Sequence, residues 1–126
     1  MTHGTARIGS TPYRTSIVVS GHVFTADEPR ARGGKGAGPA PYDLLLASLG
    51  ACTAITLKMY AERKGWALES LDVSLRLVGT DEWRIERTLV IKGLEDSQKA
   101  RLAEIAERTP VTKTLSPGLP IETRLA

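Results

Sequence analysis

The sequence predicts an α+β domain in which largely antiparallel sheets pack on a long central helix and a second, shorter helix. Three observations predict this class. Residues 41–64 hold the most apolar run, residues 68–78 alternate apolar and polar side chains, and glycines separate the strand-like segments. Helical and strand-like segments alternate irregularly, without any repeat. A chain of 126 residues supports one core, so we expect a single domain over residues 1–126.

Short strands are predicted before the central helix. Residues 6–10 form a short strand that Pro12 interrupts, and the β-branched residues 13–20 form the next one. Gly21 offers a turn, and residues 22–26 return as the second strand of a hairpin. Residues 27–41 are rich in Gly and Pro, which predicts an exposed loop without regular structure.

The central helix is predicted over residues 41–64, and Gly65 is placed to end it. Its 14-residue apolar run, residues 44–57, is too short to span a bilayer and suits a buried helix. Spacing of three and four residues puts one stripe on a common face: Leu45, Leu49, Cys52, Thr56 and Met59. Small residues at 47, 50 or 51, and 54 form a ridge, which predicts close packing by another helix of the chain or of a symmetry mate.

A hairpin and a helix follow. In residues 68–78, Leu71, Val73, Leu75 and Leu77 share one face of a half-buried strand. Residues 83–92 form its partner strand. Asp96 or Ser97 is the predicted cap of the second helix, which ends near Arg108 because Pro110 is disfavoured deeper in a helix. Residues 111–115 form a further short turn and residues 121–125 a closing strand.

Composition argues against several classes of function. The net charge of +3 is modest and spread along the chain, so nucleic-acid binding is not expected. Residues 1–15 lack an apolar core, so we expect no secretion signal, no membrane association and a cytoplasmic protein. His3 and His22 lack ligands at metal spacing, which predicts no metal site. The glycine-rich loop has Gly36 after Lys35 where a phosphate loop needs Ser or Thr, and we expect no cofactor.

Cys52, the single cysteine, lies in the middle of the apolar run. One cysteine excludes an intramolecular disulfide, as fits a reducing compartment. A free cysteine is often a small, buried hydrophobe, and this one lies beyond the reach of the helix dipole. A reactive thiolate here needs a positive partner from elsewhere in the fold. Composition and spacing leave both roles open.

Four longer motifs favour the reactive role of Cys52 over the structural one. They are Asp27-Glu28-Pro29, GGKGAGPAPYDLLLASLGAC at residues 33–52, YAERKGW at residues 60–66 and RTPVTKTLS at residues 108–116. Together they resemble the OsmC/Ohr family, named for osmotic induction and organic hydroperoxide resistance, and most closely its small OsmC-like subgroup. The resemblance implies an intertwined homodimer of α+β subunits with the long helices at its centre. It also implies thiol-dependent reduction of organic hydroperoxides near the subunit interface.

The resemblance also assigns residues. Cys52 matches the family's peroxide-reacting cysteine, whose thiolate attacks the O–O bond. The family supports this thiol with an arginine from the N-terminal strands. Arg14 is the best-placed match, and Arg30 and Arg32 are the alternatives.

Two departures from the family pattern narrow the expected activity. Thr109 stands where the peroxidases have a second, resolving cysteine, so a two-cysteine cycle within the chain is impossible. Tyr42 stands at the place of the glutamate that pairs with the arginine, and the nearest carboxylate is that of Asp43. Asp43 either substitutes for this glutamate or simply favours the helix start. We expect the pocket around the thiol to include Tyr42, Leu45, Leu49 and Thr109.

Two functions remain as predictions. The first is a one-cysteine hydroperoxide reductase that an external thiol recycles. The second is a non-enzymatic protein that binds a small molecule in an apolar cavity between helices at the dimer interface.

Overall fold

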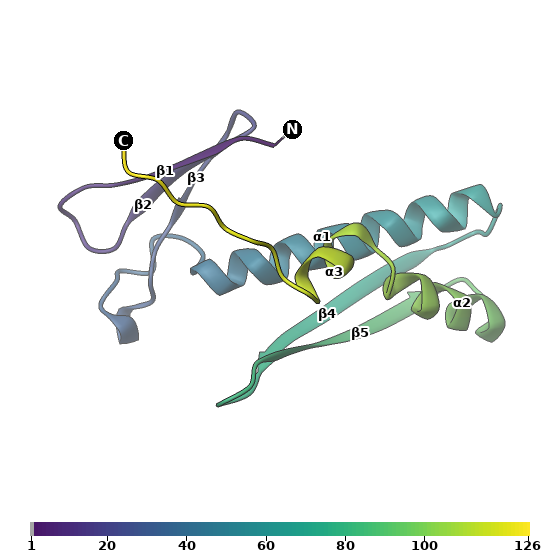
Figure 1. The fold of residues 1–126 in the computed structure, drawn as a ribbon. Coiled ribbons are helices and arrows are strands. Elements are labelled where there is room, and N and C mark those ends of the chain that lie inside the picture. The colour runs from purple at the N-terminus through teal and green to yellow at the C-terminus, as the bar shows by residue number, and fades with distance from the viewer. Residues whose placement is uncertain (1) are drawn as a thin grey trace. The chain divides into compact units, whose positions relative to one another are not determined.

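Each strand pairs only with a neighbour in the sequence, among the residues that the computed structural model describes, 2–126. One antiparallel sheet has the order β1–β2–β3 and the other joins β4 to β5 (Figure 1). The strands are β1 (Gly4–Ile8), β2 (Thr15–Val19), β3 (His22–Ala26), β4 (Ser70–Val78) and β5 (Arg84–Lys92). The helices are η1 (Arg30–Arg32), α1 (Pro41–Arg63), α2 (Asp96–Ala106) and α3 (Pro110–Leu115). The predicted α+β class is confirmed.

An N-terminal unit ends at Leu45 and contains the three-stranded sheet, η1 and the first turn of α1. Ser20 and Gly21 have φ angles of 49° and 81° and connect β2 to β3. Two positive φ angles in succession belong to the tight turn whose twist matches that of a hairpin. The predicted hairpin is therefore present: β3 has the predicted bounds, and β2 is three residues shorter than the predicted strand at residues 13–20.

Asp27 organises the loop between β3 and α1. Its side chain is only 3% exposed. Its carboxylate accepts hydrogen bonds from four backbone N–H groups: Tyr13 (3.3 Å), Glu28 (2.8 Å), Lys35 (3.2 Å) and Ala37 (3.1 Å). The Ala37 bond contributes most to lowering the pKa of Asp27, burial opposes it, and the other three bonds add to it. The predicted loop is thus irregular and largely exposed, yet it is ordered around one buried acid.

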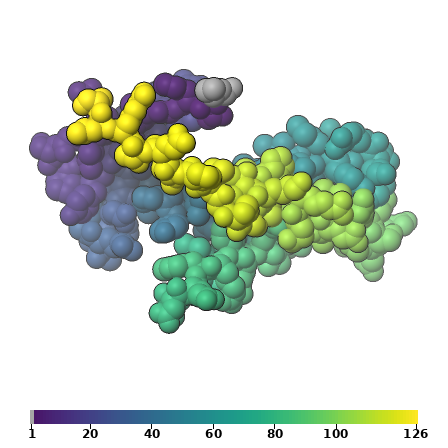
Figure 2. Space-filling model, viewed as in Figure 1, coloured from purple at the N-terminus to yellow at the C-terminus, as the bar shows by residue number. Residues whose placement is uncertain are grey.

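The C-terminal unit, Leu46–Ala126, has its core on one face of the β4–β5 hairpin. The predicted apolar face of β4 is partly buried, as its alternating burial shows. α1 and α2 contribute to the same core, whose buried members are Leu57, Ile91, Leu102 and Ala106. The turn between β4 and β5, green in Figure 2, projects away from the helices of this unit.

The stripe that α1 buries shares only Leu49 with the stripe identified from spacing. Its buried residues are Leu49, Thr53, Leu57 and Ala61, whereas Met59 of the predicted stripe is 56% exposed. Gly50 faces β4, where an added Cβ would lie 2.8 Å from Leu75 Cδ1. Within this unit, Gly50, the smallest residue of the predicted ridge, therefore packs against Leu75 of β4 and not against a second helix.

The opposite stripe of α1 is apolar and exposed, and consists of Ala47, Ala51, Ile55 and Met59. By length and composition alone, α1 could cross a membrane: it has 23 residues, and its most apolar window has a mean hydropathy of 1.5 and is 22% buried. A core helix of a soluble protein meets the same criterion. The prediction that the apolar run is too short for a span considered residues 44–57, and the complete helix is longer.

Helix ends and the C-terminus differ from the predictions in detail. The cap of α2 is Glu95, in a capping box with Gln98, and not the predicted Asp96 or Ser97; the helix spans Asp96–Ala106 and so ends before Arg108. The short turn predicted at residues 111–115 is α3. The predicted closing strand at residues 121–125 is absent, and Ile121 and Leu125 are 88% and 100% exposed. Alternation alone does not make a strand where no neighbouring strand is available for pairing.

Candidate functional site: a cysteine beside a buried arginine–threonine cluster

Cys52 lies near the middle of α1 and is half-buried. Its Sγ lies 3.9 Å from the hydroxyl of Thr56, one helical turn further along. The thiol therefore has a polar neighbour on its own helix.

Arg87 projects from β5 onto the inner face of the hairpin, where its register partner is Leu75. Its side chain is 11% exposed. A buried guanidinium needs partners for its N–H groups, because leaving them unpaired in an apolar core is costly. Arg87 is therefore expected to organise polar groups around itself.

Three elements supply acceptors for Arg87. Nη1 donates to the Thr53 hydroxyl of α1 at 3.0 Å and to the Thr112 hydroxyl of α3 at 2.9 Å. Nη2 donates to the backbone carbonyl of Ala106, the last residue of α2, at 3.0 Å. A helix end leaves such carbonyls without partners inside the helix, and a cation there also suits the helix dipole. One side chain thus joins α1, β5, α2 and α3.

Thr109 completes this arginine–threonine cluster, which we define as Arg87, Thr53, Thr109 and Thr112. Thr53 and Thr109 are both fully buried. The Thr109 and Thr112 hydroxyls lie 2.6 Å apart, and Thr53 donates to the carbonyl of Leu49 at 2.7 Å. Every buried side-chain polar atom of the described residues has a hydrogen-bond partner. The position that resembles the family's second cysteine is therefore part of a saturated polar cluster.

The charge of Arg87 is balanced only at the surface. Glu107 Oε1 lies 3.5 Å from Nη2, but the glutamate side chain is 76% exposed. Ion pairs with an exposed partner contribute little to stability, since solvent screens them. The hydroxyl and carbonyl acceptors are the principal partners of the guanidinium.

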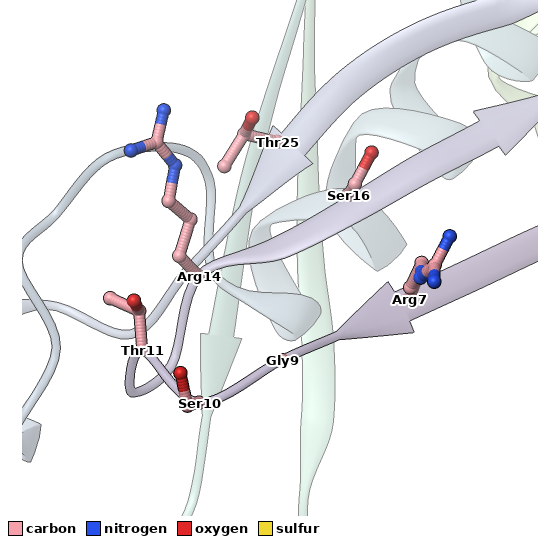
Figure 3. Close-up of a pocket in the computed structure, with 7 residues that line it drawn as sticks. All are labelled: Arg7, Gly9, Ser10, Thr11, Arg14, Ser16 and Thr25. Atoms are coloured by element: carbon pink, nitrogen blue, oxygen red, sulfur yellow. The ribbon is translucent and has the colours of Figure 1, made fainter.

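The other predicted site residues lie in the N-terminal unit or at its border. Arg14 lines an open cavity beside the sheet (Figure 3). Asp43 Oδ2 accepts a hydrogen bond from the backbone N–H of Ala40 at 2.9 Å, which is the behaviour of an acid at a helix start. No ion pair joins Arg14 to Asp43 in the described part of the chain. Tyr42 is 61% exposed.

Leu45 is half-buried and Leu49 is buried, and both precede Cys52 on α1. The alternative arginines, Arg30 and Arg32, lie in η1, where Arg32 Nε is 3.5 Å from Glu28. Thr109 is connected to Thr53, the residue that follows Cys52, through the hydrogen bonds of Thr112 and Arg87. Across residues 2–126, no group of three His, Cys, Asp or Glu side chains has an arrangement able to hold a metal ion.

The sequence analysis missed Arg87. Its signal was available, because Ile85, Arg87, Leu89 and Ile91 share the inner face of β5 by simple alternation. A charged residue on an otherwise apolar strand face requires buried partners. Of the cluster's threonines, only Thr109 was a predicted site residue, and Thr53 and Thr112 were not.

Comparison with known proteins gives a consistent result. The family model described as OsmC-like protein matches residues 33–124. A structure titled as a putative osmotic stress induced and detoxification response protein from Psychrobacter arcticus has 23% identity, a TM-score of 0.76 and coverage of 90% of this chain and 87% of its own. An OsmC-like protein from Mycoplasma pneumoniae has 18% identity, a TM-score of 0.78 and coverages of 92% and 87%.

A third similar structure is the organic hydroperoxide resistance protein OhrB of Bacillus subtilis. It has 23% identity and a TM-score of 0.63, with 90% of this chain and 88% of that chain covered. These likenesses establish the fold. No curated protein matches the chain.

Proposed function

Because the chain belongs to the OsmC-like protein family, we propose that it is a thiol-dependent redox protein that reduces organic hydroperoxides through Cys52. One observation carries this proposal: the only cysteine of the chain lies half-buried on α1, inside the region that matches the family. Similar structures named as organic hydroperoxide resistance proteins support the class of substrate.

The first step consumes one hydroperoxide. The Cys52 thiolate attacks the terminal oxygen of the hydroperoxide, an S–O bond forms and the O–O bond breaks. The leaving alkoxide takes up a proton and departs as an alcohol, so the sulfur becomes a sulfenic acid and the peroxide is reduced by two electrons. Apolar neighbours on α1 favour an alkyl or aryl hydroperoxide over hydrogen peroxide.

An external thiol completes the cycle. Thr109 cannot form a disulfide, so a small thiol attacks the sulfenic acid, forms a mixed disulfide and releases water. A second thiol molecule then frees Cys52 and leaves as a disulfide. The overall reaction converts one hydroperoxide and two thiols to an alcohol, water and one disulfide.

Activation of the thiol requires positive charge, which we propose Arg14 supplies, with Arg30 and Arg32 as alternatives. Asp43 is the proposed carboxylate partner in place of the usual glutamate. The proposed substrate pocket comprises Tyr42, Leu45, Leu49 and Thr109. The hydroxyl of Thr56 supports the thiolate from within α1.

A second copy of the chain completes the proposal. The exposed apolar stripe of α1 needs cover in water, since a contiguous apolar face of this kind marks an interaction site. We propose that the stripe of a second copy provides this cover in a homodimer. We propose further that residues 1–126 form one cytoplasmic domain with neither a membrane nor a nucleic-acid partner.

The test is direct. Purified protein is mixed with cumene hydroperoxide and dithiothreitol, and peroxide loss and dimedone-labelled Cys52 are measured. We expect turnover with cumene hydroperoxide, slower turnover with hydrogen peroxide and none in Cys52→Ser. Absence of both peroxide loss and a sulfenic acid at Cys52 would refute the proposal.

The second candidate function is non-enzymatic binding of a small apolar molecule in a cavity at the helix and dimer interface. It is favoured by one observation: the place of the second thiol holds Thr109, which is fully buried and hydrogen-bonded. Cys52→Ser separates the two functions. A binding protein retains its affinity for a fluorescent apolar ligand in this variant, whereas a peroxidase loses all turnover.

A further inference from the structure

An open cavity of about 300 Å³ lies on the three-stranded sheet of the N-terminal unit. Strand register builds its floor, because Arg7 pairs with Ser16 and Ser16 with Thr25, which places all three on one face. The segment between β1 and β2 adds Ser10, Thr11 and Arg14. Figure 3 shows the side chains of Arg7, Arg14, Ser16 and Thr25 on the same side of the sheet.

The lining is rich in hydrogen-bond donors and holds no acid. Two arginines and four hydroxyl-bearing residues line this open cavity, and no acidic residue is among them. All of these side chains are exposed except half-buried Thr25, and Figure 3 shows the two guanidinium groups on either side of Ser16 and Thr25. Neither Arg7 nor Arg14 forms an ion pair with any side chain of the described residues. The two guanidinium groups repel each other because they carry the same charge. An anion bound between them attracts both groups, so the net electrostatic interaction becomes favourable.

We propose that this cavity binds the phosphoryl group of a small phosphate-bearing molecule. Guanidinium groups match the geometry of phosphate and carboxylate oxygens with paired N–H donors. A carboxylate has two oxygens and about four acceptor sites, fewer than two guanidiniums and four hydroxyls offer. A phosphoryl group presents three acceptor oxygens that share up to two negative charges, and it uses more of these donors.

The size of the cavity limits the ligand. Pockets for small molecules start at about 300 Å³, so the cavity accommodates a phosphoryl group and little more than one attached ring. Arg14 is also the arginine proposed to activate Cys52, whereas Arg7, Ser16 and Thr25 have no part in the proposed peroxide chemistry, so the variants that test the anion site are made among these sheet residues.

Isothermal titration calorimetry with inorganic phosphate, phenyl phosphate and benzoate tests the inference on the full chain. We expect saturable binding of at least one phosphate and at least tenfold weaker binding of benzoate. Tighter binding of phenyl phosphate identifies an organic phosphate as the ligand type, and equal binding identifies the free anion. Both results support a phosphoryl site.

Variants locate the binding. Arg7→Gln is expected to weaken phosphate binding at least tenfold. Arg63→Gln removes an equal charge at the end of α1 and is expected to change it less than twofold. Ser16→Ala keeps the charges of Arg7 and Arg14 and is expected to weaken phosphate binding about threefold. It replaces Arg7→Gln as the test if that variant does not fold. Absence of saturable phosphate binding, benzoate binding of equal strength, or equal losses in the Arg7 and Arg63 variants would overturn the proposal.

Discussion

The Arg87 guanidinium lies 3.0 Å from the Thr53 hydroxyl, and Thr53 directly follows Cys52 on α1. This contact fixes the rotation of α1 about its axis. Successive residues on a helix are about 100° apart, so turning Thr53 toward the hairpin leaves Cys52 at the edge of the packed face. The half-buried position of the sulfur follows from the polar contact of its neighbour.

Replacing Arg87 should destabilise the C-terminal unit. Arg87→Ala removes the donor shared by Thr53, Thr112 and the Ala106 carbonyl, and we expect a loss of about 2–4 kcal/mol in the free energy of unfolding. Urea unfolding followed by circular dichroism measures this loss. Arg84→Ala is the matched control, because Arg84 lies on the same strand with its side chain 67% exposed and should cost less than about 1 kcal/mol. Equal losses in the two variants would contradict the assigned role of Arg87.

A cysteine at position 109 should change how the oxidised thiol is resolved. In Thr109→Cys the new thiol replaces a hydroxyl inside the cluster that contains Thr53, next to Cys52. After one equivalent of cumene hydroperoxide, we expect an intramolecular disulfide, which intact mass and reversal by dithiothreitol identify.

The unmodified protein should instead retain a dimedone-reactive sulfenic acid. Thr109→Ser is the control for disturbance of the cluster, since it keeps a hydroxyl at this position. If Thr109→Cys also retains the sulfenic acid, the correspondence between Thr109 and the family's second cysteine is wrong.

A charge on the exposed stripe of α1 should break the proposed dimer. Ile55 is 55% exposed and belongs to the stripe with Ala47, Ala51 and Met59. Burying a carboxylate at a subunit contact costs several kcal/mol, so Ile55→Glu should shift the protein from dimer to monomer. Light scattering coupled to size-exclusion chromatography measures the mass. Thr80→Glu adds the same charge in the exposed turn after β4 and should leave the mass unchanged. A wild-type protein that is monomeric at all concentrations would rule out the dimer.

The carboxylate of Asp27 should make stability depend on acid pH. Its pKa is held below the usual value by backbone N–H groups, first that of Ala37. A lowered folded-state pKa gives stability that is present above the unfolded value, about 3.9, and is lost as the pH falls through the folded value. Asp27→Asn should therefore lower the melting temperature at pH 7.

The difference between Asp27→Asn and the wild type should shrink as the pH falls below about 4, because protonation removes the same charge from the wild type. Asp72→Asn, on the exposed face of β4, should show no such pattern. Thermal unfolding at pH 7 and pH 3 checks both variants. If the difference in melting temperature between wild type and Asp27→Asn is the same at the two pH values, the charge of Asp27 does not order the loop.

The sequence predicted those elements whose signals are local. Alternation placed β4, Gly65 marked the end of α1 and Gly21 marked the hairpin turn, since each reports a backbone or burial requirement within a few residues. The prediction of a closing strand at residues 121–125 was wrong, because a strand depends on more than its local sequence. A strand needs a pairing partner, and the alternation of Ile121, Thr123 and Leu125 carries no information about one.

The site was predicted only in part. Cys52 and Thr109 came from a family resemblance, whereas Arg87 is specified by contacts across the fold: its acceptors lie 34 and 25 residues away in sequence at Thr53 and Thr112. The sequence did not identify which face of α1 is buried, because residues 44–57 are mostly apolar or small on every side. Periodicity has little contrast in such a segment, and the sheet that packs on it decides which stripe is buried.

Pairing between sequence neighbours has a consequence for folding kinetics. β1–β2–β3 and β4–β5 are all joined in order, so no strand pairing in the described chain waits for the closure of a long loop. Chains with such low contact order gain their sheet structure quickly, because the entropy lost on loop closure is small. Each hairpin is therefore expected to form early and locally. If the second copy is needed to cover α1, the encounter of two chains becomes the slow, concentration-dependent step of refolding.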